Sequence, residues 1–378
     1  MFKRNNNCYL AAIVLAVFIL SLLAVYASSA CTKEMKLSAR AATLYQPDTD
    51  NFIYSKNSDS RLHMASTTKI MTALVTLEKE EDLDRLIEVD PSAIGTEGSS
   101  AYLKTGDTVT VRELLYALML ASANDAAVAL ACHVGNGITG FAALMNEKAE
   151  ELGLEDTHFA NPHGLDDDEH YTTAHDLALI AAEALKNEQF AQICSTYRKT
   201  FVTGDRQRTY TNHNKLLKSY DGAIGVKTGF TDESGRCLVG AAERDGLRFI
   251  TVTLDAPSDW ADHKAMLDYG FDCFERVTLA SVYEYSYDLP VIDKAGKSVR
   301  VSNTSELYKI ANKGNHTIKE YVNLPRYVTG NVKPGDALGY VDFELDGESV
   351  GRVMLIATEE NTIKAERLID KIKRWIFG

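Results

Sequence analysis

The order of the predicted secondary-structure elements constrains this fold more than any other feature of the sequence. Side chains alternate over residues 39–54, with a turn at 47–50, which indicates a strand hairpin. Strand patterns return at 237–242 and 249–254. Because early and late strands around a helical region typically pair in one sheet, we expect an α+β domain at 31–274. Between the strands, apolar residues recur at helical spacing in the segments 67–78, 111–120, 126–134, 140–152 and 173–186.

Residues 275–358 form a second predicted domain. Helical periodicity ends near Phe274, and Tyr, Val, Asp and Gly become frequent. Asp346 and Gly347 separate two strand-like segments, 340–345 and 350–356, which is a typical hairpin signal. We therefore expect a small all-β, sandwich-like domain here.

The last segment, 359–378, has the pattern of a basic amphipathic helix. It is too short and too charged to span a bilayer, and its basic character contrasts with the acidic remainder of the chain. These features favour attachment to a membrane surface, with packing against its own domain as the alternative. The apolar residues are Ile363, Leu368, Ile369, Ile372, Ile376 and Phe377, and the basic ones are Lys364, Arg367, Lys371, Lys373 and Arg374.

The first thirty residues resemble a secretory signal peptide. Lys3 and Arg4 precede the apolar run 9–26, and the small residues 27–30 follow it. We expect residues 1–30 to be removed and the protein to be exported to the outer face of the cytoplasmic membrane or the cell wall. An uncleaved anchor and a lipidated Cys31 are the alternatives.

Charge and cysteine content exclude several other classes. The chain carries 40 basic and 53 acidic residues, a formal net charge of −13, so its overall field does not favour nucleic acid. No closely spaced cysteine pair suggests a zinc site, so we expect buried free thiols, no metal and no cofactor. The cysteines are Cys8, Cys31, Cys132, Cys194, Cys237 and Cys273.

Three short motifs carry side chains suited to acyl transfer. Ser66 and Lys69 stand one helical turn apart at the start of the first strong helix, where a neutral amine can activate a hydroxyl. Ser122 and Asn124 lie between two apolar helices, and the Lys-Thr-Gly run 227–229 precedes a strand. Each motif alone also fits an ordinary helix cap, helix break or hairpin edge.

In this order, Ser-x-x-Lys, Ser-x-Asn and Lys-Thr-Gly are the motif set of penicillin-binding proteins and class A β-lactamases. The stretches 65–73, 161–165 and 225–231 resemble the serine-type D-Ala-D-Ala carboxypeptidases of peptidase family S11, the low-molecular-weight penicillin-binding proteins. The resemblance implies a β-lactamase/transpeptidase-like domain, built from an antiparallel sheet and a helical region. The small β domain and the terminal helix also match that family's layout.

The resemblance implies catalytic roles for three residues. Ser66 would attack the carbonyl of the penultimate D-alanine of a peptidoglycan stem peptide and form an acyl-enzyme. Lys69 would take its proton, which requires a strongly depressed lysine pKa, and Lys227 nearby would supply like-charge repulsion. Ser122 would relay the proton to the leaving amine.

The same resemblance implies how substrate or a β-lactam is held. Asn124 would bind Lys69 and the substrate amide. The segment of Lys227, Thr228, Gly229 and Phe230 would line the site, with the lysine and threonine binding the substrate's terminal carboxylate. The backbone N–H groups of Phe230 and the nucleophile would form the oxyanion hole.

Two departures from the family pattern leave alternatives open. Members often carry a second carboxylate-binding arginine after the strand that follows Lys-Thr-Gly, but 255–263 contains none, so His263 or Arg236 is the expected substitute. The stretch 157–165 lacks the glutamate that class A β-lactamases use for deacylation. This absence favours a peptidase that penicillin traps over a β-lactamase.

Two further functions compete with this interpretation. A metallopeptidase would use His158, His163, His170 and His175, but these lack the His-Glu-x-x-His spacing of a zinc helix. A non-catalytic cell-wall-binding protein is the second alternative, against which the intact motifs argue.

Overall fold

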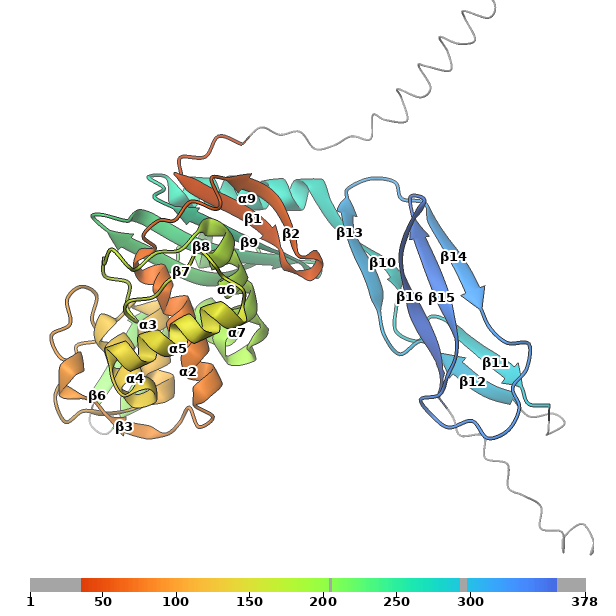
Figure 1. The fold of residues 1–378 in the computed structure, drawn as a ribbon, viewed down its shortest axis with the longest axis horizontal. Helices are drawn as coiled ribbons and strands as arrows, with labels where there is room; N and C mark the ends of the chain where they lie inside the picture. Colours follow the sequence, from red (N-terminus) through yellow and green to blue (C-terminus); the bar gives the residue numbers. More distant parts are fainter. Residues whose placement is uncertain (1–34, 204–205, 293–297, 359–378) are drawn as a thin grey trace, which may run out of the picture. The chain divides into compact units, whose positions relative to one another are not determined.

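The computed structural model describes residues 35–203, 206–292 and 298–358. The chain divides into two compact units, Met1–Cys273 and Phe274–Gly378, and each has its own hydrophobic core (Figure 1). The predicted signal peptide at 1–30 and the predicted terminal helix at 359–378 lie outside the described residues.

A five-stranded antiparallel sheet organises the first unit. Its strands are β1 (Ala41–Gln46), β2 (Asn51–Lys56), β7 (Ala223–Thr231), β8 (Gly235–Arg244) and β9 (Leu247–Leu254). Their order is β2-β1-β9-β8-β7, so early and late strands pair in one sheet, as predicted. β1 and β2 form the predicted hairpin. β7 lies at one edge of this sheet, which leaves its outer side for other partners.

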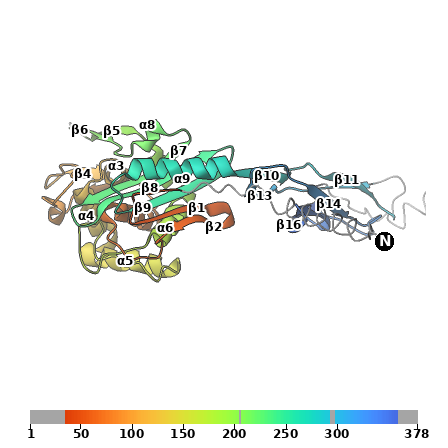
Figure 2. The same ribbon diagram turned by 90° about the horizontal axis from the view of Figure 1, so that it is seen from above.

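Helices cover both faces of this sheet (Figure 2). α9 (Asp259–Cys273) packs on one face and α6 (Ala174–Lys186) on the other, and both contact the central strand β9. Phe249 of β9 and Phe271 of α9 meet edge to face with ring centroids 5.0 Å apart. A Cβ at Gly270 would lie 2.9 Å from the Phe249 ring, so the helix approaches the sheet closely only because residue 270 is glycine.

The central helix α2 (Lys69–Lys79) is buried over its first eight residues. It follows a 3-10 turn, Ala65–Thr68, and packs among the other helices of the unit. A helix buried on all sides is normally apolar throughout, so the lysine at its start is an exception that calls for a chemical reason. The surrounding helices are α3 (Val111–Leu120), α4 (Asn124–Gly135), α5 (Ile138–Glu151), α6 and α7 (Glu188–Ser195).

Short elements complete the unit. Thr110 caps α3 by accepting the N–H of Glu113, and Thr173 caps α6 by accepting the N–H of Asp176. The remaining elements are the hairpin of β3 (Leu86–Glu88) and β4 (Thr108–Thr110), the hairpin of β5 (Arg198–Thr203) and β6 (Arg206–Thr211), and α8 (Leu216–Ser219).

The second unit is built from strands. A five-stranded sheet has the order β11-β12-β16-β15-β14, and β10 pairs with β13. Asp346 and Gly347 both have positive φ, 55° and 92°, in the predicted hairpin between β15 and β16. The bounds are β10 Phe274–Ala280, β11 Ser286–Pro290, β12 Ser298–Ser302, β13 Leu307–Asn312, β14 Ile318–Asn323, β15 Ala337–Leu345 and β16 Glu348–Ala357.

One expectation about the cysteines is wrong. Cys132, Cys194 and Cys237 are free, and the last two are buried, as predicted. Cys273 is disulfide-bonded, whereas the sequence spacing indicated only free thiols. Spacing fails here because a disulfide depends on proximity in space and not in sequence.

Within the described residues, no single helix is long and apolar enough to cross a membrane, and only the bent pair α4 and α5 passes a test of length and composition.

We expect Phe249→Ala to lower the free energy of unfolding of the first unit by about 3–5 kcal/mol, because it leaves a cavity between β9 and α9. Phe249→Leu should cost less than about 1.5 kcal/mol, since it retains most of the volume. Urea denaturation monitored by tryptophan fluorescence measures both values. Equal destabilisation by the two variants would contradict the packing described.

Candidate active site

The side chains of Ser66 and Lys69 meet at the start of α2. The 3-10 turn carries Ser66 into the helix, and one turn later Lys69 projects back toward it. Lys69 Nζ lies 2.8 Å from Ser66 Oγ. Lys69 itself is fully buried, so its amine has no access to bulk water.

The Lys69 amine has two further contacts, both with oxygen atoms that can only accept a hydrogen bond. Its Nζ donates to Asn124 Oδ1 at 2.7 Å and to the carbonyl oxygen of His163. A neutral amine has two N–H groups and one lone pair. Because the two oxygens use both N–H groups, the lone pair is left to face the Ser66 hydroxyl. This arrangement suits proton abstraction from Ser66.

The electrostatic environment of Lys69 favours the neutral amine. Burial lowers the pKa of Lys69 well below its ordinary value, and the positive charge of Lys227 lowers it further. The carboxylate of Asp125 acts in the opposite direction. Asp125 is occupied, however, by the backbone N–H groups of Ala101 and Leu103 and by the Ser100 hydroxyl.

Ser122 and Asn124 reach the site from the break between α3 and α4. Ser122 has a left-handed backbone (φ 59°) and is 5% exposed, which turns its hydroxyl inward. Asn124 is the first residue of α4, and its N–H bonds to Ser99 O while its Nδ2 donates to Glu97 O. A Cβ at Gly98 would lie 2.7 Å from Nδ2, so this close approach requires glycine.

Lys227 joins the same cluster from β7. Its Nζ donates to Ser122 Oγ at 3.0 Å and to Thr228 O at 2.8 Å. Burial lowers the pKa of Lys227 to about 7. The structure thus brings Ser66, Lys69, Ser122 and Lys227 together from three separate segments of the chain.

A pocket of about 330 Å³ opens over this cluster along the edge strand β7. A Cβ at Gly229 would lie 3.0 Å from the backbone nitrogen of Ser66, so a larger residue would crowd the site. Phe230 is 60% exposed at the rim. An unpaired strand edge offers backbone groups to an extended peptide. The lining residues are Ser66, Ser99, Ser122, His213, Lys215, Thr228, Gly229, Phe230, Arg236, Asp259 and Trp260.

The 161–165 loop packs against the turn that carries Ser66. Asn161 Oδ1 accepts the N–H groups of His163 and Gly164, which fixes the loop, and His163 O then contacts Lys69. A Cβ at Gly164 (φ 87°) would lie 2.0 Å from Ala65 O. Glycine is therefore required both by its backbone conformation and by the turn that carries the nucleophile.

His170 belongs to this support, whereas the sequence indicated it only as a ligand in the competing metallopeptidase hypothesis. Its Nδ1 accepts the N–H of Ala160, so Nε2 carries the proton and donates to Thr68 Oγ1 at 2.7 Å. The Thr68 hydroxyl in turn donates to Ala65 O at 2.7 Å. Burial lowers the pKa of His170 to about 3, which keeps this chain of bonds neutral.

The histidines of the competing metallopeptidase hypothesis are engaged in hydrogen bonds. His170 uses both ring nitrogens, and His163 Nδ1 accepts the N–H of Leu165. In the parts of the chain that the structure describes, no group of three or more His, Cys, Asp or Glu residues could hold a metal ion.

The structure distinguishes between the two residues expected to replace the missing arginine, because only one of them lines the pocket. His263 is fully buried, and its ring nitrogens lie 2.7 Å from Thr251 Oγ1 and 3.0 Å from Thr253 Oγ1, away from the pocket lining. Arg236 lines the pocket opposite Phe230 on the neighbouring strand, and its guanidinium donates to Asp259 Oδ2 at 3.0 Å. Arg236 therefore remains the only one of the two that can reach a ligand.

Other pocket residues gave no recognisable sequence signal. Ser99, His213, Lys215 and Trp260 carry no motif spacing, and loops or helix ends bring them to the pocket. Lys215 Nζ lies 5.8 Å from the centre of the Trp260 ring. Nothing local in the sequence distinguishes these residues, because only the fold brings them to the pocket.

Comparison with known proteins identifies the family. The family model for D-alanyl-D-alanine carboxypeptidases, Peptidase S11, matches residues 28–258. The chain belongs to this family. The resemblance noted in the sequence is thereby confirmed, and the protein is a serine peptidase of the S11 class.

Curated relatives extend the match over most of the chain. D-alanyl-D-alanine carboxypeptidase DacF of Bacillus subtilis is 31% identical over 353 residues, covering 91% of this chain and 90% of the relative. The D-alanyl-D-alanine carboxypeptidase of Streptomyces sp. strain K15 is 39% identical over 243 residues, covering 59% and 84%.

Two solved structures share the fold. The DacD carboxypeptidase of Francisella tularensis has 28% identity and a TM-score of 0.64, covering 87% of this chain and 95% of that one. Penicillin binding protein 5 of Haemophilus influenzae has 25% identity and a TM-score of 0.66, covering 87% and 99%. The predicted α+β fold class is confirmed.

We expect Lys227→Gln to move the acid limb of the pH profile for acylation by benzylpenicillin to higher pH. Removal of the neighbouring ammonium raises the pKa of Lys69, so the neutral amine that acts as the base forms only at higher pH. The second-order acylation rate measured against pH tests this expectation. Lys215→Gln, which removes a cation from the pocket mouth, should leave the limb in place; an unmoved limb in Lys227→Gln would contradict the coupling.

Proposed function

We propose that this protein removes the terminal D-alanine from peptidoglycan stem peptides through a Ser66 acyl-enzyme. The observation that carries the proposal is the buried Lys69 amine, which lies 2.8 Å from Ser66 Oγ and also contacts Asn124 Oδ1 and His163 O. The names of the curated relatives support the choice of reaction.

The first half of the reaction breaks the bond between the two D-alanines. Ser66 Oγ bonds to the carbonyl carbon of the penultimate D-alanine while its proton passes to Lys69. Ser122, which accepts a hydrogen bond from Lys227, relays that proton from Lys69 to the leaving amine, so Lys69 is neutral again when the amine departs. The N–H groups of Ser66 and Phe230 stabilise the oxyanion, where the loss of one donor typically costs about 2.7–4 kcal/mol.

The second half releases the shortened peptide. Water attacks the acyl carbon, Lys69 accepts the water's proton, and the proton returns to Ser66 Oγ as the ester bond breaks. Penicillin acylates Ser66 by the same first half of the reaction. In the 157–165 stretch, where a β-lactamase would hold a deacylating glutamate, the sequence is Thr-His-Phe-Ala-Asn-Pro-His-Gly-Leu. A long-lived penicilloyl-enzyme is therefore expected rather than drug turnover.

Arg236 supplies the cation that a terminal carboxylate needs. It shares the pocket with Thr228, and Asp259 at the start of α9 orients its guanidinium. Arginine has five N–H donors, so the bond to Asp259 leaves others to bind a carboxylate. Lys227 and Thr228 complete this end of the site.

We also propose a cell-wall setting for this chemistry. Residues 1–30 have the pattern of an export signal, and residues 359–378 have that of a helix lying on a membrane surface. Together they support a location at the outer face of the cytoplasmic membrane, where peptidoglycan is built and trimmed.

We expect Ser66→Ala to abolish both penicillin labelling and D-alanine release while the fold is retained. Intact-mass spectrometry after benzylpenicillin treatment, combined with an assay for free D-alanine, tests this. Ser195→Ala, a change at an exposed serine on α7, is the matched control and should behave as wild type. Labelling that persists in Ser66→Ala would refute the mechanism, and sustained nitrocefin hydrolysis by wild type would favour the β-lactamase alternative.

We expect Arg236→Gln to raise KM for a D-Ala-D-Ala peptide about tenfold, the effect of losing one charge-assisted contact. The same variant should treat an analogue with an amidated C-terminus as wild type does, because that analogue presents no carboxylate. Arg236→Lys should recover part of the loss. Equal losses on both substrates would show that Arg236 acts on the fold and not on the carboxylate.

A further inference from the structure

A cluster of hydrogen bonds lies at the end of β7, outside the lining of the catalytic pocket. Thr231, the last residue of β7, and Ser234, in the turn to β8, both contact the side chain of Asp166. Thr231 Oγ1 lies 2.8 Å and Ser234 Oγ 2.9 Å from the same oxygen, Asp166 Oδ1. An ionised carboxylate can only accept hydrogen bonds, so both hydroxyls donate to it. We call these three residues the Asp166 clamp.

The hydroxyls of the clamp also organise the turn between β7 and β8. Thr231 Oγ1 accepts the backbone N–H of Ser234 at 2.9 Å, and the two hydroxyl oxygens lie 2.8 Å apart. Ser234 is 4% exposed, so its hydroxyl depends on these protein partners rather than on water. The turn is therefore folded around the two groups that bind Asp166.

On its other side, the clamp belongs to the loop that orients the catalytic base. Asp166 stands at the end of the loop whose backbone Asn161 fixes, and Asn161 Nδ2 donates to Leu165 O, immediately before Asp166. Three residues before Asp166, His163 O contacts the Lys69 amine. The position of Asp166 is therefore tied to that of the base.

The strand side of the clamp adjoins the oxyanion hole. Phe230, whose N–H stabilises the oxyanion in the mechanism proposed above, is the residue before Thr231. β7 pairs with β8 on one side and forms the edge of its sheet on the other. An edge strand lacks a second strand to fix its lateral position, so a contact from another segment can supply this restraint. The clamp supplies it from a residue 65 positions earlier in the chain.

A second contact reaches the same turn but is weaker. His63 Nε2 lies 3.4 Å from Glu233 Oε1, and the Glu233 side chain is 60% exposed. An exposed pair of this kind contributes little, because water competes for both groups and salt screens them. The clamp is therefore the contact that we expect to fix the end of β7.

We propose that Asp166 is a positioning residue that holds the Phe230 N–H where it can donate to the developing oxyanion. The inference rests on the Ser66 acyl-enzyme mechanism proposed above. Asp166 acts by joining the end of β7 to the loop that orients Lys69. Its effect on the rate follows from the narrow range of useful distances, since an oxyanion-hole donor must lie about 2.7–3.1 Å from the oxyanion.

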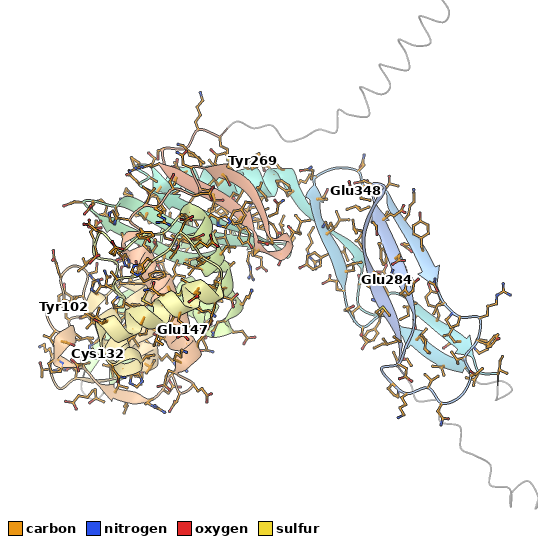
Figure 3. The ribbon with its side chains drawn as sticks, viewed as in Figure 1. Tyr102, Cys132, Glu147, Tyr269, Glu284 and Glu348 are labelled. Carbon is orange, nitrogen blue, oxygen red and sulfur yellow. The ribbon has the colours of Figure 1, made fainter. Side chains whose placement is uncertain are left out.

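Four single variants separate the hydrogen bonds of the clamp from its charge. Asp166→Ala removes the acceptor, whereas Asp166→Asn retains the Oδ1 atom that both hydroxyls contact. Asp168→Ala removes the same charge from an exposed position of the same loop. Glu348→Ala removes a charge from an exposed position on β16 of the other unit, where Figure 3 shows Glu348.

We expect Asp166→Ala to lower the second-order rate of acylation by benzylpenicillin and the rate of penicilloyl release about tenfold each, the effect of losing one charge-assisted bond. For a D-Ala-D-Ala peptide, kcat should fall about tenfold while KM stays within about twofold, because the oxyanion hole serves acylation and deacylation alike. Asp166→Asn should stay within about threefold of wild type, since it keeps a neutral acceptor. Asp168→Ala and Glu348→Ala should behave as wild type.

Ser234→Ala tests the clamp from the other side. It removes one donor and should lower the same rates about threefold, but it should cause no further loss when combined with Asp166→Ala. Urea denaturation shows which variants are folded. If Asp166→Ala does not fold, the loss of rate in Ser234→Ala at unchanged KM is the deciding measurement.

Wild-type rates in folded Asp166→Ala, or in Ser234→Ala if Asp166→Ala does not fold, would overturn the positioning role and leave the Ser66 mechanism intact. Equal losses in Asp166→Ala and Asp166→Asn, a comparable loss in Asp168→Ala, or additive losses in the double variant would overturn it as well. A wild-type protein that benzylpenicillin never acylates would instead refute the proposed function itself.

Discussion

The contact between a buried amine and a serine hydroxyl determines the rest of this catalytic unit. An ammonium at Lys69 would have to be desolvated in the protein core, which is costly, so burial and the nearby Lys227 favour the neutral form. A neutral amine can take the Ser66 proton only if its lone pair points at the hydroxyl. Asn124 Oδ1 and His163 O orient the amine in this way by accepting its two N–H groups. The base is therefore prepared by its neighbours before any substrate arrives.

The fold delivers these neighbours from distant parts of the chain. The central helix supplies the nucleophile and the base, the α3–α4 break supplies Ser122 and Asn124, and edge strand β7 supplies Lys227. A fourth segment, 161–170, supports the turn at Ala65 through Gly164 and through the His170–Thr68 bonds. β1 pairs with β9, so the strands that precede and follow the helical region in sequence lie side by side in one sheet. This pairing connects the two ends of the segment that carries the site residues.

The sequence predicted what depends on local pattern. α3 has the predicted bounds, the β1–β2 and β15–β16 hairpins form at their turn residues, and the motif residues converge. It did not predict contacts that depend on long-range geometry. His170 has no motif spacing, yet it supports the nucleophile turn. His263 and Arg236 were equal candidates until the structure buried one and placed the other in the pocket. The Cys273 disulfide belongs to the same class, because a disulfide depends on proximity in space and not on spacing in sequence.

The most direct test of this account is a titration of the Lys69 amine itself. NMR of protein labelled with ¹³C at the lysine side chains, compared with a Lys69→Arg sample, assigns the Lys69 signal and follows it with pH. The account predicts that Lys69 titrates with a midpoint well below that of the exposed lysines. Replacement of Lys227 should raise this midpoint part of the way toward the ordinary lysine value. A Lys69 midpoint at the ordinary lysine value near 10.4 would mean that the amine is charged at neutral pH, and that Ser66 has no base beside it.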